Sequence, residues 1–348
     1  MNKTAVIKLR RQLNRLDLES FLITKQTNVT YLSGFRGEGQ LLITPTKNFL
    51  ITDLRFIEQA KKIPSADVFP RKSHCPLEES IRRLSEKLKL RRMGFESDGI
   101  SFNFHRRLKK SNTGRQLIPQ TCIIEKIRSI KSAAEIELLR QAAKLALASF
   151  KYAQKIIRPG QKESAVADEL QYFMRQQGAE DSAFDPIVAS GIRSSLPHAP
   201  ISSKIIRNNQ PVLVDLGCRL SGYNSDLTRM VFLGKIGGKL KRIYQAVRQA
   251  QQLAISVVKA GVEASQVDLT ARNYLRKEKL APFFVHALGH GIGRDIHEAP
   301  SISSQNKSVL APGMVFTVEP GIYLPGWGGV RVEDMVLVKK NGAEVLTK

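Results

Sequence analysis

Two aspartates flank a predicted β-hairpin in the stretch VLVDLGCRLSGYNSDLTR. Asp215 lies in the first strand, where period-two alternation places the aliphatic residues on the other face. Asp226 follows eleven residues later, and a turn centred on 220–221 would put the two aspartates directly opposite each other. Facing carboxylates repel, so this pairing predicts a cation between them. The alternative is a pair of solvent-facing acids at a hairpin.

Two further carboxylates lie within apolar strands. Glu319 follows MVFTV and alternates with Phe316 and Val318, and Glu333 in GVRVED shares a strand face with Arg331. An acidic side chain in such a strand is costly to bury without a partner. These acids favour a carboxylate-lined site, although each strand alone could be an ordinary half-exposed one.

Four of the six histidines of the chain lie within about 100 residues of one another. His286, His290 and His297 fall in HALGHGIGRDIH, whose glycines favour an irregular loop over the HExxH helix of a mononuclear zinc protease. His198 lies in SSLPHAP, a loop stiffened by two prolines. This clustering favours a functional site over separate structural histidines.

The donor types indicate the class of metal. Carboxylates with an imidazole are hard, oxygen-rich ligands, which suit Mn²⁺ better than they suit a thiolate zinc site. Four carboxylates carry four negative charges, which two divalent ions would balance. Two such ions can activate a bridging water and polarise a carbonyl, which is the chemistry of amide hydrolysis. The sequence therefore predicts two divalent ions, with Mn²⁺ favoured and Co²⁺ or Zn²⁺ as alternatives.

The elements that must position these residues divide the chain near residue 126. Residues 20–60 alternate apolar strands with turns, and a helix is expected from Leu54 after an Asp53 cap. Helices are also expected over 78–92 and over about 162–178 and 238–260. The segment 127–157 has a long helix pattern, with Ser132 as the expected N-cap. This order predicts a smaller α/β domain over 1–126 and an α+β catalytic domain over 127–348.

The composition is that of a globular protein with an unusual charge. The 348 residues are 42% hydrophobic, and no apolar run reaches the roughly 18 residues of a membrane-spanning helix. Three cysteines without a CxxC pair favour a reducing, cytoplasmic setting. The net charge of +24 would attract polyanions, so a nucleic-acid-binding protein is the rival hypothesis. The basic helix over 78–92 lacks interleaved aromatics for base stacking, which speaks against that role.

The chain resembles metallopeptidases of the creatinase/aminopeptidase P/prolidase type, whose catalytic domain has the pita-bread fold. NVTYLSGFRGEGQLLIT resembles their N-terminal domain. Five further segments resemble, in the same order, the active-site blocks of that family: DPIVASGIRSSLPHAP, VDLGCRLSGYNSDLTR, HALGHGIGRDIHEAP, PGMVFTVEPGIY and GVRVED. Five blocks in the family order make the resemblance specific.

The resemblance implies a role for each candidate residue. Asp215 would bind one metal ion, His290 and Glu319 the other, and Asp226 and Glu333 would bridge the pair. The same resemblance implies that His198 and His297 would contact the substrate carbonyl or the developing oxyanion, and that Glu319 would also transfer a proton. His286 and Arg331 match positions of the proline-specific branch and would hold the proline end of the substrate.

The implied function is hydrolysis of the Xaa-Pro bond at the N-terminus of proline-containing peptides. An Xaa-Pro aminopeptidase is favoured over an Xaa-Pro dipeptidase, which differs in accepting dipeptides alone. The family also implies a homodimer.

Overall fold

The computed structural model describes residues 2–72 and 74–348, which form two compact units. The first unit ends at Arg128 and the second begins at Ser129. Within the described residues, no helix combines the length and the apolar character that crossing a membrane requires.

The first unit is an α/β domain. Its elements are α1 (Lys3–Arg15), β1 (Ser20–Ile23), α2 (Gln26–Ser33), β2 (Gly39–Ile43), β3 (Asn48–Asp53), the 3₁₀ helix η1 (Leu54–Phe56), α3 (Ile57–Lys61), β4 (Asp67–Arg71), α4 (Leu77–Lys87), β5 (Arg92–Glu96), α5 (Phe102–Ser111), β6 (Gln116–Gln120) and α6 (Ile123–Ser129).

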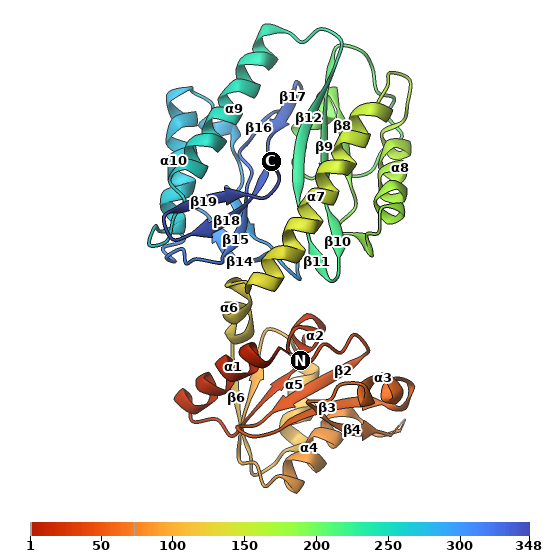
Figure 1. The fold of residues 1–348 in the computed structure, drawn as a ribbon, viewed down its shortest axis with the longest axis vertical. Helices are drawn as coiled ribbons and strands as arrows, with labels where there is room; N and C mark the ends of the chain where they lie inside the picture. The colour runs from red at the N-terminus through yellow and green to blue at the C-terminus, as the bar shows by residue number, and fades with distance from the viewer. Residues whose placement is uncertain (1, 73) are drawn as a thin grey trace. The chain divides into compact units, whose positions relative to one another are not determined.

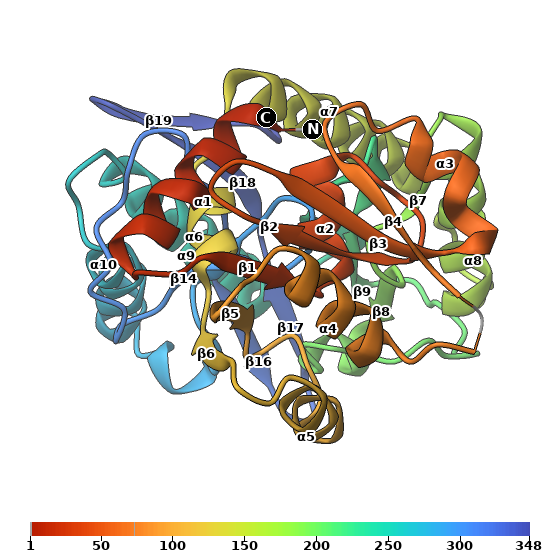
Figure 2. The ribbon, with the colours of Figure 1, turned by 90° about the horizontal axis from the view of Figure 1, so that it is seen from below.

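Alternation along the strands gives this domain a core on each face of its sheet. The described residues form one six-stranded sheet in the order β4-β3-β2-β1-β5-β6, which Figure 2 shows side by side. Phe21 and Ile23 pack in one core with residues of α1 and α2. Leu22, between them, points into the other core with residues of α4 and α5.

The helices of the first unit differ in part from the prediction. The Asp53 carboxylate caps the following turn by accepting from Arg55 N at 2.9 Å, but this turn is 3₁₀ before α3 begins. The helix expected over 78–92 ends at Lys87, and Arg92 already begins the strand β5. The helix α2 was not predicted from its sequence.

The second unit contains the predicted site residues. Its elements are α7 (Ala133–Ile156), α8 (Glu163–Gln176), β7 (Asp181–Ser182), β8 (Ile187–Ser190), η2 (Gly191–Ser195), β9 (Gln210–Leu216), β10 (Cys218–Leu220), β11 (Tyr223–Asn224), β12 (Leu227–Leu233), α9 (Gly238–Ser256), α10 (Ala264–Lys277), η3 (Ala281–Phe283), β13 (Gly289–Gly291), β14 (Glu298–Ile302), β15 (Val315–Val318), β16 (Gly321–Leu324), β17 (Gly328–Arg331), β18 (Asp334–Lys339) and β19 (Gly342–Val345).

Two pairs of helices cover the curved strands of this unit from opposite sides (Figure 1). One core joins α7 and α8 to β9 and β12, and another joins α9 and α10 to β15, β17 and β18. The capping box predicted at the start of α7 is present, with Ser132 Oγ accepting from Glu135 N and the Glu135 carboxylate accepting from Ser132 N. The helix α10 was missed, and α9 ends four residues before its predicted end.

The register of the aspartate hairpin differs from the prediction. Asp215 lies opposite Thr228, and the expected direct pairing with Asp226 is therefore wrong. The turn centres on Ser221-Gly222, whose φ angles of 52° and 76° are both left-handed, as a two-residue hairpin turn of type I′ requires. Moving the turn by one residue shifts every pairing by two, so the two aspartates still lie on one face of the hairpin.

Candidate metal centre and its cavity

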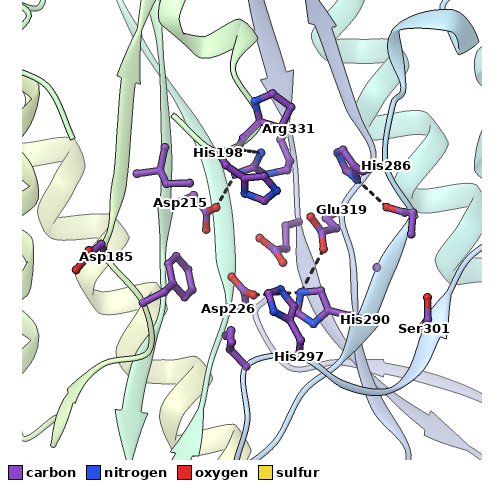
Figure 3. Close-up of a pocket in the computed structure, with 17 residues that line it drawn as sticks. Asp185, His198, Asp215, Asp226, His286, His290, His297, Ser301, Glu319 and Arg331 are labelled. Carbon is purple, nitrogen blue, oxygen red and sulfur yellow. Dashed lines mark hydrogen bonds and ion pairs between the residues drawn. The ribbon is translucent and has the colours of Figure 1, made fainter. Parts of the chain in front are cut away.

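All nine side chains that the sequence predicted for the site line one cavity of about 440 Å³ in the second unit (Figure 3). They are His198, Asp215, Asp226, His286, His290, His297, Glu319, Arg331 and Glu333. The lining also includes apolar side chains, among them Phe184, Ile187 and Ile296. A partly apolar cavity with convergent polar groups is the usual form of a small-molecule site.

Strand alternation aims the carboxylates inward. Glu319 directly follows β15, in which Phe316 and Val318 belong to the core beneath α9 and α10. Glu333 directly precedes β18, and its neighbours Val330 and Val332 belong to the same core. The acidic residues therefore take the strand face that the apolar ones leave, as the sequence predicted.

His290 lies in the short strand β13, where the sequence had predicted an irregular loop. The pairing of β13 with β14 shifts register between His290 and Gly291, so the strand is itself irregular. Gly289 and Gly291 are required there, because a Cβ atom at these positions would lie 1.9 Å from Thr317 O and 2.2 Å from Ala299 O. This close approach brings the His290 imidazole to the strand that precedes Glu319.

Three of the side chains lie close enough to share one metal ion. Ligand atoms of Asp226, His290 and Glu333 all lie within 4.8 Å of one another. His290 Nε2 lies 3.5 Å from Asp226 Oδ2 and 3.4 Å from Glu319 Oε1. Four of the five predicted ligands, Asp226, His290, Glu319 and Glu333, therefore lie together within the described residues.

The fifth predicted ligand, Asp215, forms a buried ion pair. Arg331 Nη2 donates to Asp215 Oδ2 at 2.5 Å, and both side chains are almost wholly buried. Asp215 Oδ1 is buried and has no hydrogen-bond partner within the described part of the chain. Leaving a carboxylate oxygen buried and unpartnered is costly, so this atom is a candidate for a metal ligand.

The carboxylates are destabilised by burial and by one another. Burial, followed by the charges of Glu333 and Asp215, raises the pKa of Asp226 well above its ordinary value. Burial, followed by neighbouring carboxylates, likewise raises the pKa of Glu333, and burial raises that of Glu319. Two like charges 4 Å apart repel by about 4 kcal/mol at an effective dielectric constant of 20. Divalent cations would remove this repulsion, so the residues present fit a metal centre.

Three of the site histidines are in the neutral form, which can bind a metal ion or donate a hydrogen bond. Burial lowers the pKa of His286 and of His290 to about 4, and it also lowers that of His297. These imidazoles are therefore neutral near pH 7, which leaves a lone pair for a ligand. The rings of His290 and His297 contact edge to face, with centroids 4.2 Å apart.

Two polar residues that sequence reasoning missed connect the site. Thr228 Oγ1 donates to Glu333 Oε2 at 2.7 Å and accepts from Arg331 Nε at 2.9 Å. The Tyr323 hydroxyl accepts from Arg331 Nη1 at 2.8 Å and lies 3.0 Å from His286 Nε2. Thr228 lies two residues after Asp226 on the same strand face, so alternation could have identified it. Tyr323 gave no comparable signal.

Comparisons with known proteins agree with this arrangement. Residues 137–340 match Metallopeptidase family M24, and residues 6–130 match the Creatinase/Prolidase N-terminal domain. The chain is 37% identical to an Xaa-Pro dipeptidase of Pyrococcus horikoshii, over 97% of this chain and 94% of the relative.

Solved structures show the same two-domain fold. A structure named Xaa-Pro dipeptidase from Bacillus anthracis superposes with a TM-score of 0.95 at 38% identity, covering 99% of this chain and 97% of that one. The X-Pro aminopeptidase from Thermotoga maritima superposes with a TM-score of 0.90 at 35% identity, covering 97% of each chain. The expected fold is thereby confirmed. The chain belongs to metallopeptidase family M24, with a pita-bread catalytic domain preceded by a creatinase/prolidase-type N-terminal domain.

Proposed function

We propose that this protein hydrolyses the Xaa-Pro bond of short peptides with two divalent ions, held by Asp215, Asp226, His290, Glu319 and Glu333. The observation that carries the proposal is the convergence of these four carboxylates and one imidazole on a single cavity. Arg331 is the only lysine or arginine that forms an ion pair with any of these carboxylates in the described part of the chain, and it contacts Asp215. The ion pair leaves three negative charges on the site, more than one divalent ion can balance, so two ions are proposed; Mn²⁺ suits these ligands.

On this proposal Asp215 would hold one ion, His290 and Glu319 would hold the other, and Asp226 and Glu333 would be shared between the two. The ions would supply the positive charge that polarises the scissile carbonyl and activates water. His198 and His297 donate hydrogen bonds to the carbonyl oxygen as negative charge develops on it. Glu319 accepts the proton of the attacking water and passes it to the departing proline nitrogen.

The proline end of the substrate would lie beside His286 and Arg331. In the described chain, protein groups already accept from four of the five N–H donors of Arg331, which leaves one for a substrate carboxylate. Arg331 therefore serves the substrate and also fixes Asp215 and Tyr323.

Dipeptides are the favoured substrate class. Two of the relatives above are named Xaa-Pro dipeptidase, which moves the proposal away from the aminopeptidase that the sequence favoured. An Xaa-Pro aminopeptidase is the second candidate, supported by the name of the Thermotoga maritima structure. A homodimer is also proposed, and sedimentation velocity would test it.

The test is incubation with Mn²⁺ and either Ala-Pro or Ala-Pro-Ala, with release of alanine followed by mass spectrometry. We expect alanine from the dipeptide and much less from the tripeptide. Equal or faster cleavage of the tripeptide would establish the aminopeptidase. No cleavage of either peptide would refute the proposed function.

A further inference from the structure

A buried carboxylate outside the cavity holds the loop that carries His198. Glu163 is the first residue of α8, and only 1% of its surface is exposed. We propose that Glu163 is a positioning residue, which places His198 for the reaction by fixing both ends of the segment 190–204. This inference rests on the role of His198 in the proposed function.

Glu163 binds the start of the segment through one carboxylate oxygen. Glu163 Oε1 accepts from Ser190 N at 2.7 Å and from Ser190 Oγ at 2.8 Å. Ser190 is the last residue of β8, so these bonds fix the point at which the chain leaves the sheet for η2.

The other carboxylate oxygen binds the return of the segment. Glu163 Oε2 accepts from Ser202 Oγ at 2.8 Å and from Arg193 Nε at 2.8 Å. Arg193 in turn donates through Nη2 to Pro200 O, which lies two residues after His198. The backbone of Glu163 adds a further bond, from its N–H to Lys204 O at 3.0 Å. A single buried carboxylate thus connects both ends of the segment.

The cavity side of the same segment is held by β17. Arg331 Nη1 donates to Pro197 O at 3.0 Å, and Gly329 N donates to Ser194 Oγ at 2.8 Å. Pro197 directly precedes His198. The segment is therefore fixed at its apex by the strand that carries Arg331 and at its base by Glu163.

The His198 side chain depends on this backbone support. It is exposed, and its imidazole makes no hydrogen bond within the described residues. Without a hydrogen bond of its own, the imidazole relies on the course of the loop for its place in the cavity. A displacement of about 1 Å in a group that contacts the reacting carbonyl can cost about 100-fold in rate.

The substitution Glu163→Gln keeps the size of the side chain and removes the second acceptor. The amide NH₂ would face the Arg193 and Ser202 donors, or the Ser190 donors if the amide turned over. One end of the segment would therefore lose its anchor. The matched control is Glu169→Gln on the same helix. Glu169 also accepts a hydrogen bond, from Tyr152 Oη at 2.7 Å, but it does not line the cavity.

We expect Glu163→Gln to lower kcat on Ala-Pro by about 10- to 100-fold, with KM and Mn²⁺ affinity close to those of the wild type. Ser202→Ala, a milder change, should lower kcat by a smaller factor, and Glu169→Gln should leave kcat unchanged. In a His198→Ala background, Glu163→Gln should cost less than twofold, because its effect passes through His198. Losses that multiply in the double variant would overturn the proposal.

Hydrogen–deuterium exchange of the metal-free protein gives a readout that needs no turnover. Glu163→Gln should speed amide exchange within 190–204 and leave β9 and β12 unchanged. Unchanged exchange in that segment, or uniformly faster exchange across the catalytic domain, would contradict the proposal. An inactive wild type would instead refute the proposed function, while a wild-type kcat in Glu163→Gln would refute the positioning role alone.

Discussion

Residues around the carboxylates determine how the ligands are aimed. Thr228 is fully buried, and its hydroxyl joins Glu333 to the guanidinium of Arg331. Arg331 in turn holds Asp215. One hydroxyl therefore links two of the proposed metal ligands, Glu333 directly and Asp215 through Arg331.

Replacing Thr228 by Val removes this hydroxyl with little change in volume. Glu333 Oε2 would lose a donor and Arg331 Nε an acceptor, which leaves both buried groups without these bonds. We expect Mn²⁺ affinity or kcat to fall by about 10- to 100-fold, as is typical of changes around metal ligands. Isothermal titration with Mn²⁺ and peptide assays would measure both. Thr228→Ser retains the hydroxyl and should remain close to the wild type; equal losses in the two variants would contradict this role.

At this scale the sequence predicted charged and ionisable residues better than their neutral partners. The acids and histidines stood out because each is costly in an apolar strand or a glycine-rich loop. Thr228 and Tyr323 are common in ordinary strands, so their residue type alone carries no signal. Alternation places Thr228 on the strand face of Asp226, but the partners of Thr228 and Tyr323 lie on strands distant in sequence, and only the folded chain defines those contacts.

At the scale of the element, glycines allow the strands to approach one another around the cavity. Gly289 precedes His290, and a side chain there would overlap Thr317 O in β15. Gly238 lies at the start of α9, where a Cβ atom would meet nothing within 4 Å. The two positions therefore differ in packing while sharing a residue type.

Gly289→Ala should displace β13 from β15 and move the His290 imidazole. We expect a loss of about 1–3 kcal/mol in the free energy of unfolding, together with weaker Mn²⁺ binding. Gly238→Ala should be neutral or stabilising by about 0.4–1 kcal/mol, because alanine restricts the unfolded chain more than glycine does. Urea denaturation of both variants would measure the difference. Equal stability of the two variants would show that the close approach is not required.

The capping box of α7 supports a second element-scale prediction. Ser132→Ala removes the side-chain acceptor at the helix N-terminus and should cost about 1 kcal/mol in the free energy of unfolding. Ser132→Thr retains a hydroxyl that can accept from Glu135 N and donate to the Glu135 carboxylate, as Ser132 Oγ does, and should be close to the wild type. Thermal and urea melts would measure both, and a stability loss in Ser132→Thr equal to that of Ser132→Ala would contradict the capping role.

Elements with a strong local signal were predicted well, and register was not. Ser132 and Glu135 act within one turn, so the sequence reveals them directly. The pairing of Asp215 depends on the centre of a short turn, where an error of one residue moves the partner from Asp226 to Thr228. The shared face survived this error because strand periodicity is two. The prediction of a site was therefore sounder than the pairing from which it began.

At the scale of the whole molecule, the charge of +24 has no part in the proposed chemistry. The field would attract polyanions, but attraction of this kind is screened by salt. We expect duplex DNA binding that is detectable at low ionic strength and lost at physiological salt, as filter binding would measure. Retention at physiological salt that persists in Asp226→Ala would instead favour a nucleic-acid-binding protein on a peptidase scaffold.

The two-ion site is the central claim, and equilibrium titration of the metal-free protein with Mn²⁺ tests it most directly. The wild type should bind two ions per chain, and Glu333→Gln should weaken both sites because a bridging ligand contacts each ion. A stoichiometry of one ion or none, or unchanged uptake of two ions by Glu333→Gln, would contradict the account.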